Sequence, residues 1–159
     1  MAQKLSRNVS RRRVEHRVVT AVGVWFYAVN TKRYLYLLRN DKKYAGTWGL
    51  PGGKVEKNET LLEALVRECH EELSCWPEPI KLAPIEQFVS DDQRFIYHTF
   101  LSVIDQEFLP VLNHEHVGYA WVNSDQIPKS MHPGLWITSN IDAVQAKIKT
   151  LTDLISRSA

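Results

Sequence analysis

Residues 52–75, GGKVEKNETLLEALVRECHEELSC, are the stretch that decides the fold. They predict a helix that begins at Glu59 or Thr60 and ends at Leu73, because Pro77 and Pro79 prevent its continuation. At helical periodicity, several apolar side chains fall on one side, which we expect to pack in the core. These residues are Leu62, Val66, Cys69 and Leu73, with Leu65 beside them.

Three carboxylates of this helix share an arc of roughly 100°, away from the centre of the apolar side. They belong to Glu68, Glu71 and Glu72. Arg67 is the one cation spaced to relieve their repulsion, and acids near a helix C-terminus oppose the macrodipole. One interpretation is an acidic surface helix; the other is a site for a hard divalent cation such as Mg²⁺, which prefers oxygen ligands. Gly52 and Gly53 favour the site, because glycine lets the backbone approach closely and offer a carbonyl oxygen.

Outside this segment, strand-like and helix-like stretches alternate. β-branched and aromatic residues predict strands at residues 17–29, 34–39, 80–89, 94–104 and 117–122. A loop punctuated by glycine and proline is predicted over residues 40–53, and an amphipathic helix over residues 139–156. Strands interleaved with two helices predict an α/β fold in which helices cover a mixed β-sheet.

Length and composition indicate one globular domain. No apolar run of the 159 residues reaches the roughly 18 residues of a membrane-spanning helix. The N-terminus also lacks the apolar core of a secretory signal, so we expect a soluble, cytoplasmic protein that does not contact membranes. The first 17 positions hold six basic residues and a single acid, Glu15. We therefore predict a basic arm at residues 1–16 and a single domain at residues 17–159; the arm is either a solvated terminus or attracts RNA or polyphosphate.

The charged residues of the decisive segment resemble the signature of the Nudix hydrolase family, also called MutT-like. That signature runs Gly, five residues, Glu, seven residues, then Arg-Glu-apolar-any-Glu-Glu-any-Gly-apolar. The matching positions are Gly53, Glu59, Arg67, Glu68, Cys69, Glu71, Glu72 and Cys75. Ser74 departs from it, because the family has glycine there. The resemblance implies the Nudix fold, an α/β fold with a mixed β-sheet sandwiched between α-helices.

The resemblance also implies roles for these residues. Divalent ions, Mg²⁺ or Mn²⁺ as its substitute, would be held by Glu68, Glu71, Glu72 and the carbonyl of Gly52. Arg67 would orient neighbouring glutamates through charge-assisted hydrogen bonds and so contribute to catalysis. Gly53 and Glu59 would be structural positions of the box.

The general base and the substrate-binding residues are less determined. Glu68 is the base candidate within the box, and Glu115, in the later loop 109–119, is the alternative base or metal ligand. His114 and His116 flank Glu115 and are interpreted as surface-loop residues. Arg39 resembles a position that contacts phosphate in relatives, or is a plain charge at a strand end. Trp48 belongs to a set of aromatic residues that could stack on a base, most of which we expect in the core.

Three functions remain open on the sequence alone. The first is Mg-dependent hydrolysis of a phosphoanhydride bond in a nucleoside diphosphate linked to another moiety, such as ADP-ribose, a dinucleoside polyphosphate or a nucleotide sugar. The second is a hydrolase acting on RNA 5′ ends or nucleoside triphosphates, and the third is a catalytically silent nucleotide-binding module. Because every charged position of the box is filled, the sequence favours an enzyme; many relatives pair up, so a homodimer is compatible with the resemblance.

Overall fold

The central strand pair of the sheet joins two segments that are far apart in the sequence. β1 (Val19–Ala28) runs parallel to β6 (Phe95–Ile104), with the two strands in register along their whole length. All positions of β1 from 21 to 28 are buried, which is typical of a strand covered on both faces. The computed structural model describes residues 17–158, so the basic arm predicted at residues 1–16 lies outside the described residues.

The other strands complete a seven-stranded mixed sheet. β5 (Lys81–Val89) pairs with the outer edge of β6, while β2 (Arg33–Arg39) and β4 (Gly52–Lys54) both pair with β1. β2 also pairs with β3 (Trp48–Gly49) and β7 (His116–Val122). These strand pairings are antiparallel, so the parallel β1–β6 pair makes the sheet mixed.

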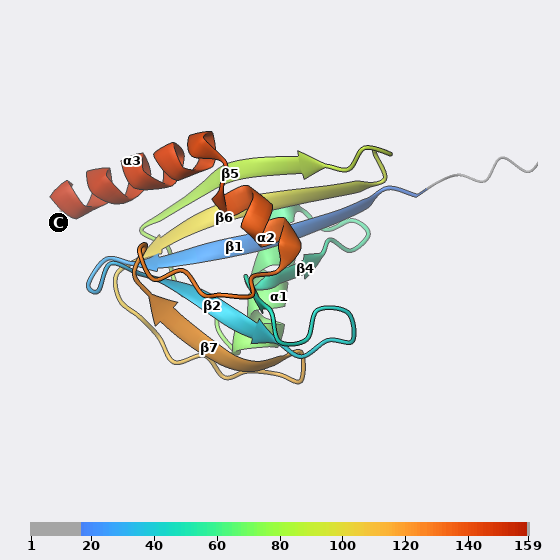
Figure 1. Cartoon of the computed structure of the whole chain (residues 1–159), viewed down its shortest axis with the longest axis horizontal. Helices are drawn as coiled ribbons and strands as arrows, with labels where there is room; N and C mark the ends of the chain where they lie inside the picture. The colour runs from blue at the N-terminus through green and yellow to red at the C-terminus, as the bar shows by residue number, and fades with distance from the viewer. Residues whose placement is uncertain (1–16, 159) are drawn as a thin grey trace, which may run out of the picture.

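Helices cover both faces of the sheet (Figure 1). α1 (Leu61–Leu73) lies behind it, and α2 (Pro133–Ser139) and α3 (Asp142–Ser158) lie in front. This arrangement confirms the predicted α/β fold with a mixed sheet between helices. Within residues 17–158, no helix combines the length and the apolar character that crossing a membrane requires.

β1 contributes to the hydrophobic cores on both faces, because side chains alternate along a strand. Val24 and Phe26 belong to the buried cluster that contains Leu65 of α1. Trp25, between them, belongs to the cluster that contains Val144 of α3. Alternate side chains of this one strand therefore pack against the helices on the two sides of the sheet.

α1 has defined signals at both ends. Thr60 and Glu63 form a capping box: the Thr60 hydroxyl accepts the Glu63 N–H at 3.2 Å, and the Glu63 carboxylate accepts the Thr60 N–H at 2.7 Å. At the other end, Ser74 takes the left-handed conformation with φ 62°, and its N–H donates to the His70 carbonyl. The helix ends where the sequence predicts, and serine adopts the conformation that glycine favours.

The predictions of a loop over residues 40–53 and of a helix over residues 139–156 are wrong in part. The loop over residues 40–53 contains β3 and the start of β4, because Trp48 and Gly49 pair with Leu38 and Leu37 of β2. The helix predicted over residues 139–156 begins later, at α3, and the preceding α2 escaped prediction. α2 has seven residues, about two turns, which is too short for helical periodicity to be recognised.

The predicted orientation of α1 is also wrong in part. Leu62, expected on the core side, is 50% exposed, whereas Glu68 and Glu72 are buried with exposed fractions of 8% and 2%. The buried apolar residues of the helix are Ala64, Leu65, Cys69 and Leu73. The helix is therefore rotated so that two of its glutamates face the protein interior.

This orientation predicts different costs for two leucines of α1. Leu65→Ala should lower the free energy of unfolding by about 2–5 kcal/mol, because it leaves a cavity at a fully buried position. Leu62→Ala should change it by roughly 0.5 kcal/mol or less, since half of that side chain already contacts water. Urea denaturation followed by circular dichroism measures both values. Equal losses for the two variants would contradict the observed rotation.

Candidate active site

A cavity of about 360 Å³ opens where α1, β4 and the start of β7 meet. Its walls combine carboxylates, cations and glycine backbone. They are formed by Arg39, Asp41, Leu50, Gly52, Gly53, Lys54, Glu68, Glu72, Glu115 and His116. Most of the site residues predicted from the sequence therefore meet at one place, although they come from distant parts of the chain.

The two glycines of β4 allow α1 to approach the sheet backbone. The Gly52 N–H donates to Glu72 Oε2 at 2.9 Å. A Cβ atom on Gly52 would lie 2.1 Å from the Val22 carbonyl oxygen, and one on Gly53 would lie 2.4 Å from the Glu68 carboxyl group. A side chain on Gly52 would clash with the β1 backbone, and one on Gly53 would displace the Glu68 carboxyl group, so the two glycines allow the close packing around the carboxylates.

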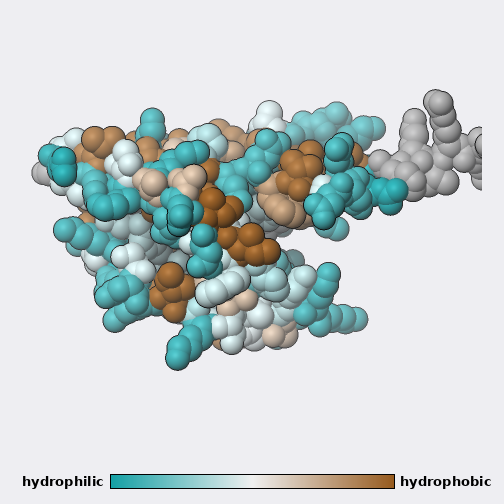
Figure 2. Space-filling model, turned by 45° about the horizontal axis from the view of Figure 1, so that its top comes forward, coloured by the Kyte–Doolittle hydropathy of each residue, from teal (hydrophilic) through white to brown (hydrophobic). Residues whose placement is uncertain are grey.

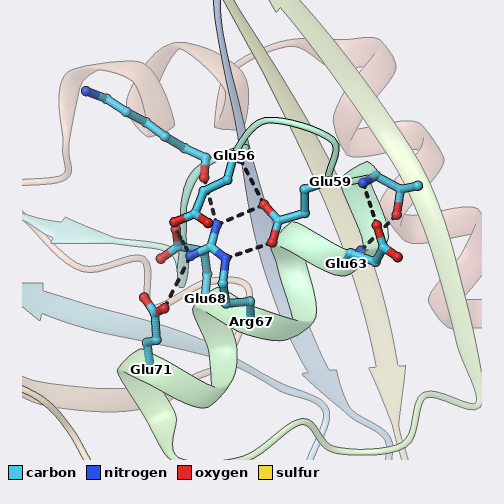
Figure 3. A network of polar contacts seen from close by, with 8 residues as sticks. Glu56, Glu59, Glu63, Arg67, Glu68 and Glu71 are labelled. Atoms are coloured by element: carbon cyan, nitrogen blue, oxygen red, sulfur yellow. Dashed lines mark hydrogen bonds and ion pairs between the residues drawn. The ribbon is translucent and has the colours of Figure 1, made fainter.

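Arg67 connects the acidic residues around α1 (Figure 3). Its guanidinium donates twice to Glu59, through Nε at 2.7 Å and Nη2 at 3.0 Å, and once to Glu68 Oε1 at 2.9 Å. Nη2 also donates to the Lys54 carbonyl at 2.9 Å, and Nη1 lies 3.4 Å from Glu71 Oε1. A planar group with several fixed donors thus orients the Glu68 carboxylate and ties β4 to the helix.

Burial makes the charged forms of Glu68 and Glu72 unfavourable. Desolvation raises the pKa of Glu72 to about 9; the Gly52 N–H opposes the shift, and the carboxylates of Glu68 and Glu115 add to it. Desolvation also raises the pKa of Glu68, although Arg67 opposes that shift. A cation between these carboxylates would favour their ionised forms and so compensate for the burial.

The donor set fits a hard divalent cation. Glu72 uses Oε2 to accept the Gly52 N–H, which leaves Oε1 available, and Glu68 keeps Oε2 beyond its bond to Arg67. Carboxylate and carbonyl oxygens are the ligands that Mg²⁺ prefers. Glu71 is placed differently, because its side chain is 55% exposed and does not line the cavity. The structure therefore groups Gly52, Glu68 and Glu72, and leaves Glu71 outside the cavity wall.

The opposite wall depends on an irregularity between β2 and β7. Leu38 pairs with Gly118, but Arg39 pairs with His116, so the register shifts between the two positions. Val117 is the additional residue of this β-bulge, and it is 60% exposed. The bulge aligns His116 with Arg39 and turns its side chain toward the cavity.

Glu115 and His116 approach Glu72 across the cavity. One possible ligand atom from each of the three side chains lies within 4.8 Å of the others. Burial, together with the nearby Arg39 charge, lowers the pKa of His116 to about 4, so its imidazole is neutral near pH 7. The interpretation of His116 as a surface-loop residue is wrong, because it is only 7% exposed. The β-bulge that buries it has no local signal in the sequence.

The two residues predicted to bind substrate lie in different environments. Arg39 lines the cavity, where its Nε donates to Asp41 Oδ2 at 2.6 Å and its Cζ lies 5.5 Å from the ring centre of Tyr44. Trp48 does not line the cavity; it pairs with Leu38 and packs against the core cluster shared with α2 and α3. Arg39 is thus placed to contact a ligand, and Trp48 is not. Asp41, which the sequence analysis did not single out, joins the wall.

A second cavity, of about 410 Å³, lies against β7 and the loop before it. Its two charged residues, Arg33 and Glu107, pair with each other at 2.6 Å. Thr31 donates to the same Glu107 oxygen at 2.6 Å. Because these charges already satisfy one another, the second cavity is a weaker candidate for binding phosphate or metal.

Comparisons with known proteins agree with this geometry. The NUDIX domain family profile matches residues 17–138. The 8-oxo-dGDP phosphatase NUDT18 of Mus musculus is 40% identical over 63 residues, which are 40% of this chain and 20% of that protein. The putative 8-oxo-dGTP diphosphatase 3 of Mycobacterium tuberculosis (strain ATCC 25618 / H37Rv) is 31% identical over 94 residues, 56% of this chain and 43% of that protein. The chain thus matches less than half the length of these curated relatives.

A solved structure shows the same fold. The MutT protein from Methanosarcina mazei Go1 is similar with a TM-score of 0.63 and 24% sequence identity. The match covers 86% of this chain and 97% of that one.

The buried carboxyl of Glu72 predicts a stability that depends on pH when no metal is present. Its pKa is about 9 in the folded protein, against an ordinary value of 4.5, so between these values the folded state keeps a proton that the unfolded chain has lost. The free energy of unfolding should therefore decrease as pH rises, by up to about 1.4 kcal/mol per pH unit from this group. Glu72→Gln removes the ionisation, so its melting temperature should exceed that of the wild type by more at pH 8 than at pH 5.

Thermal denaturation in the presence of a chelator measures this difference. Glu71→Gln is the matched control, because the Glu71 side chain is 55% exposed on the same helix. Its offset from the wild type should be similar at both pH values. A Glu72→Gln offset that also stays constant with pH would argue against a buried, protonated carboxyl.

Proposed function

This chain belongs to the NUDIX domain family, and from this membership we propose that it hydrolyses a phosphoanhydride bond in a nucleoside diphosphate linked to another moiety. One observation carries the proposal: the buried carboxylates of Glu68 and Glu72 face the cavity that Arg39 also lines. Acids on one wall would hold a divalent cation, and a guanidinium on another would hold phosphate. ADP-ribose, dinucleoside polyphosphates and nucleotide sugars are the substrates that the proposal favours.

The residues that line the cavity would have different roles in such a reaction. A divalent cation bound by Glu68, Glu72 and the Gly52 carbonyl would supply positive charge to phosphate oxygens and lower the pKa of bound water. Arg39 positions a phosphate group, and its bond to Asp41 limits the directions in which its guanidinium can point.

Water activation requires a base within hydrogen-bond reach of the attacking water. Glu68 fits only if its Oε2 accepts the proton and does not bind the cation at the same time, because Oε1 already accepts from Arg67. Glu115 is the alternative, since it lines the same cavity from the β7 side. The backbone around Glu115 is held in place by Asn40, whose N–H donates to the Glu115 carbonyl at 2.8 Å.

The names of the relatives favour a second candidate substrate class. One is an 8-oxo-dGDP phosphatase and the other a putative 8-oxo-dGTP diphosphatase. Hydrolysis of nucleoside di- or triphosphates would use the same carboxylates and divalent cation as the first candidate reaction. The two substrate classes differ in whether a further moiety is attached to the terminal phosphate. Action on RNA 5′ ends stays a prediction, because the basic arm expected to steer RNA lies outside the described residues.

Pairing of two copies also stays a prediction. On the face that Figure 2 shows, hydrophobic residues form separate groups among hydrophilic ones rather than one continuous surface.

A substrate panel with Mg²⁺ or Mn²⁺ tests the proposal. It contains ADP-ribose, diadenosine polyphosphates, nucleotide sugars, 8-oxo-dGDP, 8-oxo-dGTP and RNA with a 5′-triphosphate, and release of phosphate or mononucleotide is measured. We expect turnover of at least one compound, and we expect Glu68→Gln to lower kcat by roughly 10²–10⁴-fold, as loss of a base or metal ligand does.

Glu78→Gln is the control, because Glu78 is exposed on the segment after α1 and does not line the cavity. It should keep wild-type activity. No turnover by the folded wild-type protein with any compound and either ion would favour the nucleotide-binding module over the enzyme. The compound with the highest kcat/KM separates the two substrate classes.

A further inference from the structure

His116 is a buried polar side chain with one unsatisfied nitrogen. It is 7% exposed, and among residues 17–158 its Nδ1 has neither a donor nor an acceptor within hydrogen-bond distance. Leaving a buried polar atom without a partner costs roughly 1–3 kcal/mol. His116 lines the same cavity as Glu72, so a ligand bound in that cavity would give Nδ1 a partner and remove this cost.

The three side chains have a spacing that suits one ion. One atom each from Glu72, Glu115 and His116 lies within 4.8 Å of the others. Ligands bound at about 2.1 Å to one ion lie at most about 4.2 Å apart, so only a small closure is needed. Glu115 can provide it, because its side chain is exposed while its backbone is fixed by Asn40.

Glu72 and His116 are held more rigidly than Glu115. Glu72 Oε2 accepts the Gly52 N–H at 2.9 Å, which fixes the carboxylate and leaves its other oxygen available to an ion. His116 is fixed in β7 by the pairing with Arg39 that follows the β-bulge. Glu72 on the helix and His116 on the strand are therefore already in position, and the exposed Glu115 side chain can move to become the third ligand.

We propose that Glu72, Glu115 and His116 form a mixed carboxylate–imidazole site for a divalent transition-metal ion such as Zn²⁺ or Co²⁺. Imidazole nitrogen favours these ions over Mg²⁺, whereas an all-oxygen set does not. The site shares Glu72 with the oxygen cluster of Gly52 and Glu68, so two ions of different chemistry can occupy neighbouring positions. The inference rests on the proposed function, because it concerns the metal of the same cavity, but it is tested without any substrate.

Titration with Co²⁺ alone tests the proposal, because the visible absorption of Co²⁺ reports both its affinity and its ligands. The full chain is compared with His116→Gln, and with His114→Gln as a matched control from the exposed part of the same loop. We expect His116→Gln to weaken Co²⁺ binding by at least tenfold and to change the visible spectrum, since one nitrogen ligand is lost. Mg²⁺ affinity, measured by calorimetry, should change much less, and His114→Gln should change neither ion.

Two results overturn the proposal. One is a Co²⁺ affinity and spectrum of His116→Gln equal to those of the wild type. The other is an equal loss of Co²⁺ and Mg²⁺ affinity, which would indicate a general disturbance of the cavity.

A second measurement decides the case in which His116→Gln does not fold by circular dichroism. In wild-type protein labelled with ¹⁵N-histidine, Zn²⁺ should change the chemical shift of one ring-nitrogen resonance. The same change should occur in His114→Gln. The same shift should be absent in Glu72→Gln. If Zn²⁺ moves no ring-nitrogen resonance in the wild type, or moves one equally in Glu72→Gln, the site does not exist. These spectra need no turnover, so failure of the metal site and failure of the proposed hydrolase remain distinguishable.

Discussion

The contact between the Gly52 backbone and the Glu72 carboxylate is the constraint on which the rest of the site depends. In this contact the Gly52 N–H of β4 donates to Glu72 Oε2 at 2.9 Å, so a glutamate of α1 reaches the sheet backbone. The same contact buries Glu72 and rotates α1 away from the orientation that its apolar residues alone would select. Burying a carboxyl opposes folding, whereas enclosing it produces a cavity with a strong attraction for cations. Burial of Glu72 therefore lowers the stability of the fold and at the same time forms a candidate cation site.

Much of this site could be predicted from the sequence because its first wall is local. Gly52, Gly53, Glu68 and Glu72 lie within one strand–loop–helix segment, and helical geometry alone places the glutamates on one arc. The ends of α1 were also predictable, since proline after the helix and a threonine before it are short-range signals. The precise rotation of α1 was not predictable, because periodicity places Leu65, Cys69 and Leu73 on the inward side but does not show where the buried side ends. Leu62 and Glu72 exchanged their expected environments for that reason.

The second wall escaped the sequence analysis because it is set by pairing between distant strands. His116 reaches the cavity through a register shift opposite Arg39, and one extra residue, Val117, reverses which face the side chain occupies. Neither the number of residues in that loop nor their composition specifies such a shift. The position of Trp48 depends on a similar long-range pairing: β3 is two residues long and pairs with Leu38, and Trp48 packs against the core cluster. Short strands and bulges are decided by tertiary packing, so they were found only in the structure.

The enclosed carboxylates make folding and ion binding parts of one equilibrium. An ion that binds the folded chain, and not the unfolded one, stabilises it by about 2.7 kcal/mol when its concentration is a hundred times the dissociation constant. The Glu72 pocket is formed by elements that come together only on folding, so an ion held there would act in this way. The fraction of molecules open to proteolysis would then vary with the free concentration of that ion. Metal supply would set the lifetime of the protein as well as its chemistry.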